Sequence, residues 1–237
     1  MQNVLSSGCH NHYAGQVDSG SRFMGLKMTE YIKNNVQLQI LAAFIGMPLL
    51  IWAAGNFPQR TWLKESLSVL TILAFSLMIG LLYLTRTNKS AAKRTKLNKL
   101  INLHKIIGYS AIPVLLLHPF LLVVPRFFES GILPLEAFSI IVTTFTSRGI
   151  VLGLTAWSLL LILGVTSLIR KKLPMTYQTW RVIHGFLALL CISSAVFHVI
   201  DLGRHADFAM TFFIVLLSAG GVCLLLKNSL FKNYKKV

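Results

Sequence analysis

Acidic residues are scarce in this chain of 237 residues, which holds only seven Asp and Glu and has a charged fraction of 13%. A soluble domain of this size carries about twice that charged fraction. Hydrophobic residues make up 54% of the chain, and its mean hydropathy is +0.66. The composition therefore excludes an ordinary soluble domain and indicates a membrane protein.

Cysteine is also sparse. Cys9 lies near the N-terminus, while Cys191 and Cys223 fall within apolar runs, so no disulfide framework is visible. The sequence lacks Cys-x-x-Cys-His, the motif through which c-type heme is attached covalently. Any heme in this protein is therefore expected to be held by coordination alone.

Apolar runs long enough to cross a bilayer recur along the chain. A transmembrane helix needs about 20 mostly apolar residues to cross a hydrocarbon core roughly 30 Å thick. Six segments meet this requirement, near residues 36–54, 67–84, 103–124, 149–169, 181–200 and 208–226. We therefore predict an all-α fold, a polytopic membrane bundle of six transmembrane helices, with residues 36–226 as the membrane domain.

The segments outside these spans have a different composition. Residues 1–35 are rich in Gly, Ser and Asn and contain no apolar run like the core of a signal peptide. We expect residues 1–35 to form a disordered tail and residues 227–237 to form a short basic cytoplasmic tail. Cys9, His10 and His12 could ligate a metal, but such residues in a disordered tail usually have no binding role.

The net charge of +16 is distributed unevenly. Lys and Arg crowd the segments after the second, fourth and sixth spans, whereas the alternate loops mix basic with acidic residues. The crowded positions are Arg86, Lys89, Lys93, Arg94, Lys96, Lys99, Arg170, Lys171, Lys172, Lys227, Lys232, Lys235 and Lys236. Because Lys and Arg favour the cytoplasmic ends of spans, both termini are predicted to be cytoplasmic. The bilayer and its anionic headgroups then account for the charge, and no nucleic-acid partner is needed.

Four of the seven histidines form two pairs with identical spacing, His104 with His118 and His184 with His198. Fourteen residues of α-helix bring both members of a pair to nearly the same face, roughly 40° apart, and separate them by about 21 Å along the axis. With cytoplasmic termini, the third and fifth spans run parallel. His104 then lies at the depth of His184, and His118 at the depth of His198.

Two histidines at each depth are the ligand set of a six-coordinate heme. Neutral imidazole binds iron without adding a buried charge, and two imidazoles leave no open position on the metal. A single histidine could equally be a hydrogen-bonded packing residue, but ionisable groups within spans are costly and usually face the bundle interior for a reason. Four at matched depths predict two hemes that together form an electron path across the membrane.

Several neighbours of the histidines have two possible roles. Gly108 and Gly185 could make room for a flat macrocycle, although glycine is common in membrane helices. Aromatic rings could pack on a porphyrin or within the bundle, prolines could kink the third span, and basic side chains could pair with heme propionates or extend to the headgroups. These residues are Tyr109, Trp180 and Phe186; Pro113 and Pro119; and Lys105, Arg126, Arg148, Arg181 and Arg204.

Two stretches resemble the ferric reductase-like transmembrane domain, which is the membrane heme domain of ferric-chelate reductases and NADPH oxidases. They are LHKIIGYSAIPVLLLHPFLL in the third span and TWRVIHGFLALLCISSAVFHVI in the fifth. The resemblance covers roughly residues 67–226; Thr166, Ser167, Lys172 and Trp180 add a weaker pattern. It implies two noncovalent hemes b, with His104 and His184 on the inner iron and His118 and His198 on the outer iron.

One feature departs from that family. Its classical members continue after the sixth span into a cytoplasmic region that binds FAD and NAD(P)H, whereas this sequence ends at SLFKNYKKV. No Gly-rich nucleotide loop follows a strand here. Either a separate cytoplasmic flavoprotein or a membrane quinol donates the electrons, or the chain is a truncated version of a longer relative.

We therefore expect a multi-pass protein of the bacterial inner membrane that moves electrons outward to ferric chelate or oxygen and has no catalytic acid, base or nucleophile. One alternative is an electron-relay subunit that feeds a periplasmic reductase. The heme subunit of the methionine sulfoxide reductase system, which has a similar fifth span but fewer third-span histidines, is such a relay. A heme-free transporter or structural membrane protein is the remaining alternative.

A fifth histidine lies in the last predicted outer loop. His205 is beside Arg204 and near Asp201 and Asp207, so it could help to recruit a metal chelate. A solvated loop histidine without a special role is the simpler expectation.

Overall fold

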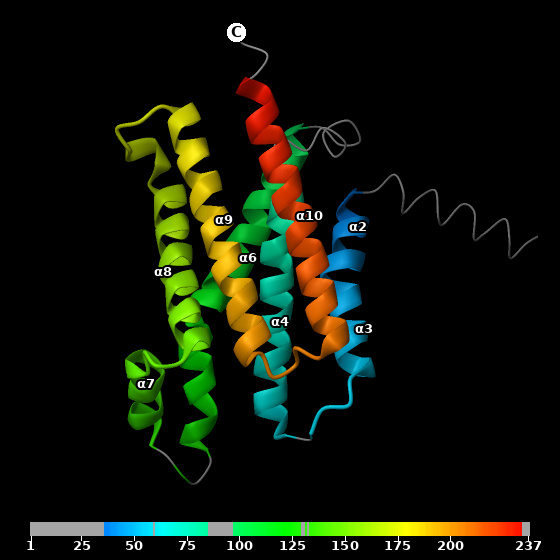
Figure 1. Cartoon of the computed structure of the whole chain (residues 1–237), viewed down its shortest axis with the longest axis vertical. Coiled ribbons are helices and arrows are strands. Elements are labelled where there is room, and N and C mark those ends of the chain that lie inside the picture. The colour runs from blue at the N-terminus through cyan, green and yellow to red at the C-terminus, as the bar shows by residue number, and fades with distance from the viewer. Residues whose placement is uncertain (1–35, 59, 85–96, 129–130, 132, 234–237) are drawn as a thin grey trace, which may run out of the picture.

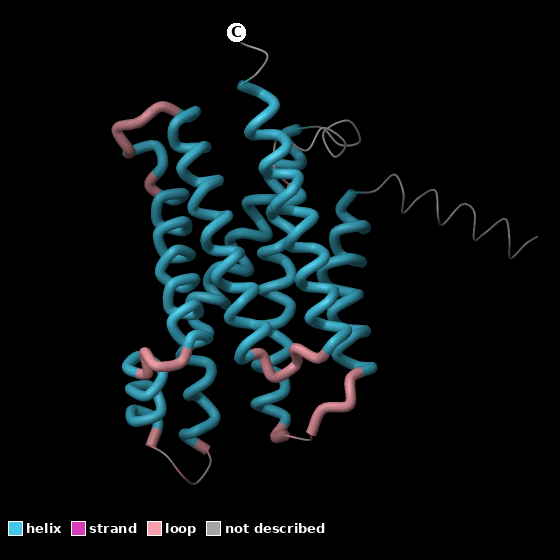
Figure 2. Tube along the Cα trace, viewed as in Figure 1, coloured by secondary structure: helices cyan, strands magenta, loops and turns pink. Residues whose placement is uncertain are grey.

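The computed structural model describes residues 36–58, 60–84, 97–128, 131 and 133–233, and every regular element in these ranges is a helix (Figures 1 and 2). The first span consists of α2 (Val36–Leu41), a π-helical turn η1 (Ala42–Gly46) and α3 (Met47–Ala54). The later spans are α4 (Trp62–Tyr83), α6 (Leu97–Val123), α8 (Arg148–Leu168), α9 (Tyr177–Leu202) and α10 (Phe208–Asn233). Short 3₁₀ turns follow α6 and α8, at Val124–Phe127 and Arg170–Lys172.

Six of these helical segments are long and apolar enough to cross a membrane, which confirms the predicted all-α bundle of six transmembrane helices. Three helices begin several residues earlier than predicted, α4 at Trp62, α6 at Leu97 and α9 at Tyr177, because their first turns are helical but contain polar residues. One helix was not predicted. This is α7 (Pro134–Thr143), which has 10 residues and is therefore too short to span a bilayer.

Helix α4 lies inside the bundle and is the most deeply buried span. Its apolar residues from Ala74 to Leu82 pack against η1 and α10 as well as α6. The hydroxyl of Tyr83 donates a 2.7 Å hydrogen bond to the carbonyl of Leu217, which ties α4 to α10. Large apolar side chains on the outer helices, such as Leu50 and Val182, are exposed, as expected for a surface in contact with lipid.

Helices α6 and α9 run parallel, both starting at the end of the bundle where α8 connects to α9 (Figure 1). Each packs mainly against another partner, α6 on α4 and α9 on α8, and direct packing between α6 and α9 is sparse. Pro113 and Pro119 lie inside α6 without ending it. The indole of Trp157 on α8 donates a 2.8 Å hydrogen bond to the Leu116 carbonyl and so links α8 to α6.

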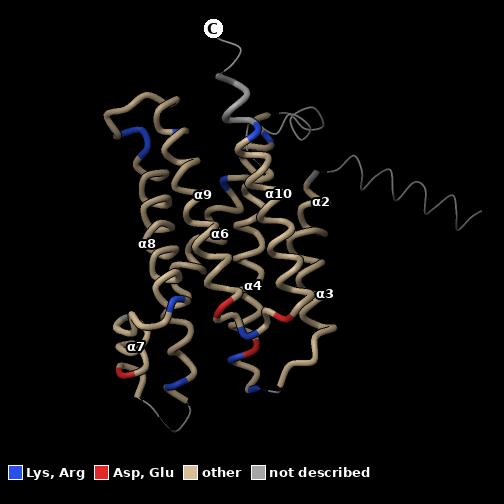
Figure 3. The backbone as a smooth tube through the Cα atoms, in the orientation of Figure 1, with Lys and Arg blue, Asp and Glu red and all other residues tan. Residues whose placement is uncertain are grey.

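Charge separates the two ends of the bundle (Figure 3). The described acidic residues Glu65, Glu136, Asp201 and Asp207 all lie at one end, together with basic residues; we call it the mixed end. The opposite, basic end holds the α8–α9 connection, and among its described residues the charged side chains are all Lys or Arg. This is the distribution on which the predicted orientation depends, and the orientation itself stays a prediction.

Some predictions concern residues outside the described ranges. The expected disordered tail of residues 1–35, with Cys9, His10 and His12, lies outside them. The same holds for Arg86, Lys89, Lys93, Arg94 and Lys96, and for the last residues of the basic tail, including Lys235 and Lys236.

Candidate functional site

The four paired histidines lie at two depths between α6 and α9. His104 and His184 lie toward the basic end and are close enough to interact electrostatically. His118 and His198 form the corresponding pair toward the mixed end. All four side chains are partly buried. The structure thus brings together the residues that the predicted ligation requires, and ligation itself stays a prediction.

Helix α8 holds the ring of His198 from behind. The Nδ1 atom of His198 lies 2.8 Å from the carbonyl oxygen of Gly149, so Nδ1 carries the proton and donates it. The ring also lies against Gly153, where a Cβ atom would come within 2.6 Å of Nδ1. Nε2 of His198 is then unprotonated and able to bind iron, which is the usual arrangement of a ligating histidine.

A hydroxyl on α4 accepts a hydrogen bond from the ring of His118. The Oγ1 atom of Thr71 lies 3.4 Å from Nδ1 of His118 and donates its own proton to the Leu67 carbonyl at 2.8 Å. Because that proton is already used, Oγ1 can only accept from Nδ1–H. His118 is therefore held in the same tautomer as His198, with Nε2 as the ligating atom.

The basic-end pair has unsatisfied nitrogens. The Nδ1 atoms of His104 and His184 are buried, and neither has a hydrogen-bond partner among the residues that the structure describes. The Leu81 backbone on α4 lies near the His104 ring but forms no hydrogen bond with its Nδ1 atom. Buried polar atoms are normally paired, and an unpaired one costs about 1 to 3 kcal/mol. Because no acceptor among the described residues fixes the proton on Nδ1, either nitrogen of these two rings is available to a metal.

A column of stacked aromatic rings packs on His184. The ring of Trp180 stacks on the His184 ring at 4.7 Å between centroids, and Tyr177 stacks on Trp180 at 6.1 Å. The Arg170 guanidinium lies 4.3 Å from the Tyr177 ring centre and 5.3 Å from that of Trp180. A small, mainly apolar pocket lined by Trp180, His184, Thr166 and Met175 adjoins the column.

Space is available beside the basic-end pair. A Cβ atom on Gly185 would meet nothing within 4 Å, and one on Gly108 would meet only Ile112 of the same helix, at 3.9 Å. These open positions and the sparse direct packing between α6 and α9 are what a flat group between the two helices would require. The other two aromatic candidates, Tyr109 and Phe186, are exposed.

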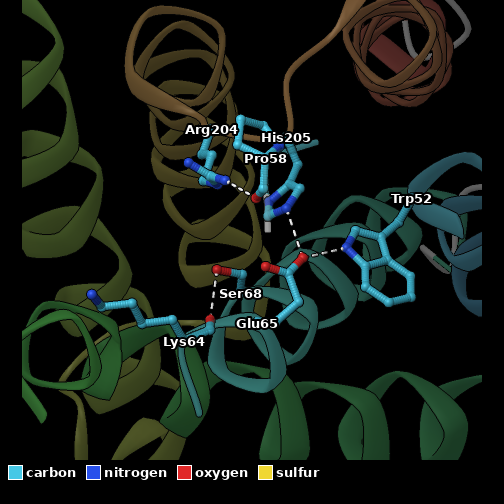
Figure 4. Close-up of polar contacts among 7 residues, drawn as sticks. All are labelled: Trp52, Pro58, Lys64, Glu65, Ser68, Arg204 and His205. Carbon is cyan, nitrogen blue, oxygen red and sulfur yellow. Dashed lines mark hydrogen bonds and ion pairs between the residues drawn. The ribbon is translucent and has the colours of Figure 1, made fainter. Parts of the chain in front are cut away.

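His205 differs from its prediction. Its side chain is 5% exposed, and its Nε2 atom lies 2.9 Å from Oε1 of Glu65 (Figure 4). The ring of Phe57 packs edge-on against it at 4.5 Å. The expectation of a solvated loop histidine is therefore wrong, because the connection between α3 and α4 folds over the imidazole.

The suggested recruitment of a metal chelate by His205 is not supported, because Glu65 already contacts its Nε2 atom and the other charged neighbours are engaged elsewhere. Asp207 accepts a 2.8 Å hydrogen bond from the Met210 amide at the start of α10, and Arg204 donates one of 2.5 Å to the Pro58 carbonyl. Within the described residues no group of three or more His, Cys, Asp or Glu could hold a metal ion. A heme iron with two axial histidines is not a group of that kind.

Three residues at the mixed-end pair were not predicted: Thr71, Gly149 and Gly153. The two glycines form a Gly-x-x-x-Gly motif in the fourth span, a pattern that permits close approach of two helices in a membrane. That motif could have predicted the close approach of the fourth span to a neighbouring helix. The sequence offered no comparable signal for Thr71, since threonines within spans commonly bond only to their own helix, as Thr155 and Thr166 do here.

The six spans define a class, the integral multi-pass membrane proteins, and the family match adds a role in membrane electron transfer. The chain belongs to the family described as ferric reductase like transmembrane component, which matches residues 70–195. This confirms the resemblance seen in the sequence, and the family is a membrane redox domain that generally binds heme. An uncharacterized protein of Archaeoglobus fulgidus is 40% identical over 162 residues, covering 68% of this chain and 88% of that protein. No solved structure matches the chain.

Proposed function

We propose that this protein is a di-heme b-type transmembrane cytochrome that carries electrons from a cytoplasmic donor to an acceptor at the outer face. One observation carries the proposal. Parallel helices α6 and α9 bring four histidines together as two pairs, one toward each end of the bundle. A packing role explains one such histidine, but it does not explain two matched pairs.

His104 and His184 would ligate the inner iron, and His118 and His198 the outer iron. Bound heme supplies one-electron exchange between ferric and ferrous iron. The residues of this chain hold the imidazoles in place. Thr71 and the Gly149 carbonyl keep the mixed-end Nε2 atoms unprotonated, and Trp180 fixes the plane of the His184 ring. No side chain is needed as an acid, base or nucleophile, since the cofactor carries the chemistry.

The direction of transfer follows from charge. The basic end would face the cytoplasm under the positive-inside rule and would receive electrons from a separate flavoprotein, which itself binds FAD and NAD(P)H, or from a membrane quinol. The mixed end would deliver electrons to ferric chelate or oxygen, or to a periplasmic reductase if the chain acts as a relay subunit. We place the protein in the cell membrane, with residues 36–226 as its heme domain.

The test is the heme content of the full chain, purified in mild detergent after expression with ample heme. We expect two noncovalent hemes b per chain with the spectrum of six-coordinate, low-spin iron. His118→Ala should leave one, while Ser193→Ala, at an exposed position of α9, should leave two. Well-folded protein that binds no heme would overturn the proposal. One heme in the unaltered chain would restrict it to a single-heme relay.

The acceptor needs a separate measurement. The chain, reconstituted in vesicles with a reduced flavin inside, is offered ferric citrate outside. External reduction would support a terminal reductase. Heme reduction without external iron reduction would support the relay subunit.

A further inference from the structure

A buried histidine in contact with a carboxylate lies at the mixed end, and neither residue is among the proposed heme ligands. Nε2 of His205 lies 2.9 Å from Oε1 of Glu65, and the same oxygen accepts a 2.8 Å hydrogen bond from the indole of Trp52 (Figure 4). The imidazole is almost fully buried, whereas the Glu65 side chain is 21% exposed. The imidazole is therefore an ionisable group inside the protein, and the partly exposed carboxylate connects it to the solvent.

The charges that act on this pair come from the two connections at the mixed end. Arg204, next to His205, and Arg60, just before α4, both act on the imidazole. The Lys64 side chain points away from the pair in Figure 4. Phe57 and Trp52 complete the surroundings with aromatic rings, so that Glu65 is the acidic partner of the imidazole.

The pair is attached to the segments that hold the outer histidines. Glu65 precedes Thr71 on α4 by six residues, or about 9 Å along the helix axis, and Thr71 contacts His118. His205 follows His198 by seven residues, just beyond the end of α9 at Leu202. From these offsets along the chain we take a separation on the order of 10 to 15 Å between the pair and the proposed outer heme.

We propose that the Glu65–His205 pair is a proton-binding site coupled to the outer heme, which binds a proton more tightly and so takes up a fraction of a proton from the outer solution when that heme gains an electron. The inference rests on the proposed function. Reduction of ferric to ferrous iron removes one positive charge from the outer site. A proton that enters through the partly exposed carboxylate and binds to the imidazole restores part of that charge, and it leaves again when the heme is oxidised.

The size of the coupling follows from Coulomb's law. For unit charges 10 to 15 Å apart and an effective dielectric constant of about 20, the proton affinity of the pair changes roughly tenfold with the heme charge. Linkage is reciprocal, so full protonation of the pair makes reduction of the outer heme more favourable by the same roughly tenfold factor.

The pH range follows from the surroundings of the imidazole. Burial lowers the pKa of His205 below its ordinary value of 6.5; Glu65 opposes this shift, and Arg204 and Arg60 add to it. Because its pKa lies below 6.5, the imidazole is mainly neutral at pH 7 and gains its proton as the solution becomes more acidic. The outer heme potential should rise as pH falls through that range and should level off above it.

The experiment is a spectroelectrochemical titration of the two-heme protein in lipid nanodiscs between about pH 5 and 8. The outer heme is identified as the one that His118→Ala removes. We expect its reduction equilibrium constant to rise about tenfold from the alkaline to the acidic limit. The inner heme should change much less over the same range.

His205→Gln should abolish this rise while two hemes remain bound. Glu136→Gln, which neutralises an exposed acid on α7 at the same end, is the matched control and should leave the rise intact. If His205→Gln disturbs folding, Glu65→Gln provides the test, because loss of the counter-charge should move the rise to lower pH.

Two results would overturn this inference: an outer potential independent of pH in the unaltered protein, or a rise that persists unchanged in both variants, as titrating propionates would produce. Neither result bears on the proposed function. Absence of heme from the unaltered chain would overturn the proposed function instead.

Discussion

The ring of His198 on α9 lies directly against the backbone of Gly153 on α8, at a position where any larger residue would displace it. A Cβ atom at residue 153 would lie 2.6 Å from Nδ1 and 2.7 Å from Cε1 of the imidazole. The neighbouring Gly149 carbonyl accepts the Nδ1 proton. One Gly-x-x-x-Gly motif thus both lets the helices approach and sets the orientation of a proposed heme ligand.

The first prediction follows from this contact. Gly153→Ala should push the His198 ring away from its position and lower the affinity for the outer heme at least tenfold, because ligating histidines depend on such support. Heme content and the low-spin spectrum report the effect. Gly164→Ala is the matched control, since a Cβ there would meet Ile112 at an ordinary 3.5 Å. Two hemes with unchanged spectra in Gly153→Ala would contradict the prediction.

Thr71 provides the second prediction. Thr71→Val keeps the shape of the side chain but removes the acceptor for Nδ1 of His118. We expect a loss of about tenfold in outer heme affinity, at the lower end of such effects because the hydrogen bond is long. Heme retention on dilution measures this affinity. Thr71→Ser, which keeps the hydroxyl, should restore the affinity. Thr155→Val serves as a control, since that hydroxyl bonds only to its own helix; equal losses in both variants would argue against a specific role.

Trp180 provides the third prediction. Trp180→Leu removes the ring that stacks on His184 and should weaken inner heme binding about two- to tenfold, the range expected for an aromatic contact. Trp180→Phe retains a ring and should lose less. Paramagnetic resonance of the oxidised inner heme, which reports the orientation of the axial imidazoles, is the measurement. Phe186→Leu, at a ring that is 60% exposed, should change neither heme affinity nor spectrum if the stack is specific.

The fourth prediction concerns stability rather than heme binding. Tyr83→Phe removes the 2.7 Å hydrogen bond to the Leu217 carbonyl between α4 and α10, which should cost about 1 kcal/mol in the free energy of unfolding. Thermal unfolding in detergent measures the loss. Tyr109→Phe, at an exposed position, should cost almost nothing. An effect of Tyr83→Phe on heme content would mean that this contact also shapes the site.

Much of the fold was predictable because transmembrane helices are set by local composition. The six spans follow from the length of apolar runs, and the ends that escaped the prediction are the first turns of α4, α6 and α9 and the polar end of α10. Helix α7 escaped as well, since a run of this length can equally be a loop or an interfacial segment. The histidine pairing was predictable because the spacing of fourteen residues and the parallel direction of two odd-numbered spans are both local or topological properties.

The surroundings of the histidines were not predictable in the same way. The solvated reading of His205 failed because its partner Glu65 is 140 positions earlier in the chain, and no local pattern connects them. The same holds for Thr71 beside His118 and for Arg170 over the aromatic column, which the sequence marked only as a basic flank.

The sequence by itself determined that this protein crosses a membrane six times, that its histidines lie at two depths, and that it belongs with the ferric reductase-like domains. Apolar length and helical periodicity act over short distances along the chain and leave a readable pattern. Tertiary structure alone decided which nitrogen of each mixed-end imidazole is free, which glycine holds the His198 ring, and that His205 is buried against Glu65. These depend on contacts between helices far apart in the chain, where a few tenths of an ångström decide whether a group is paired.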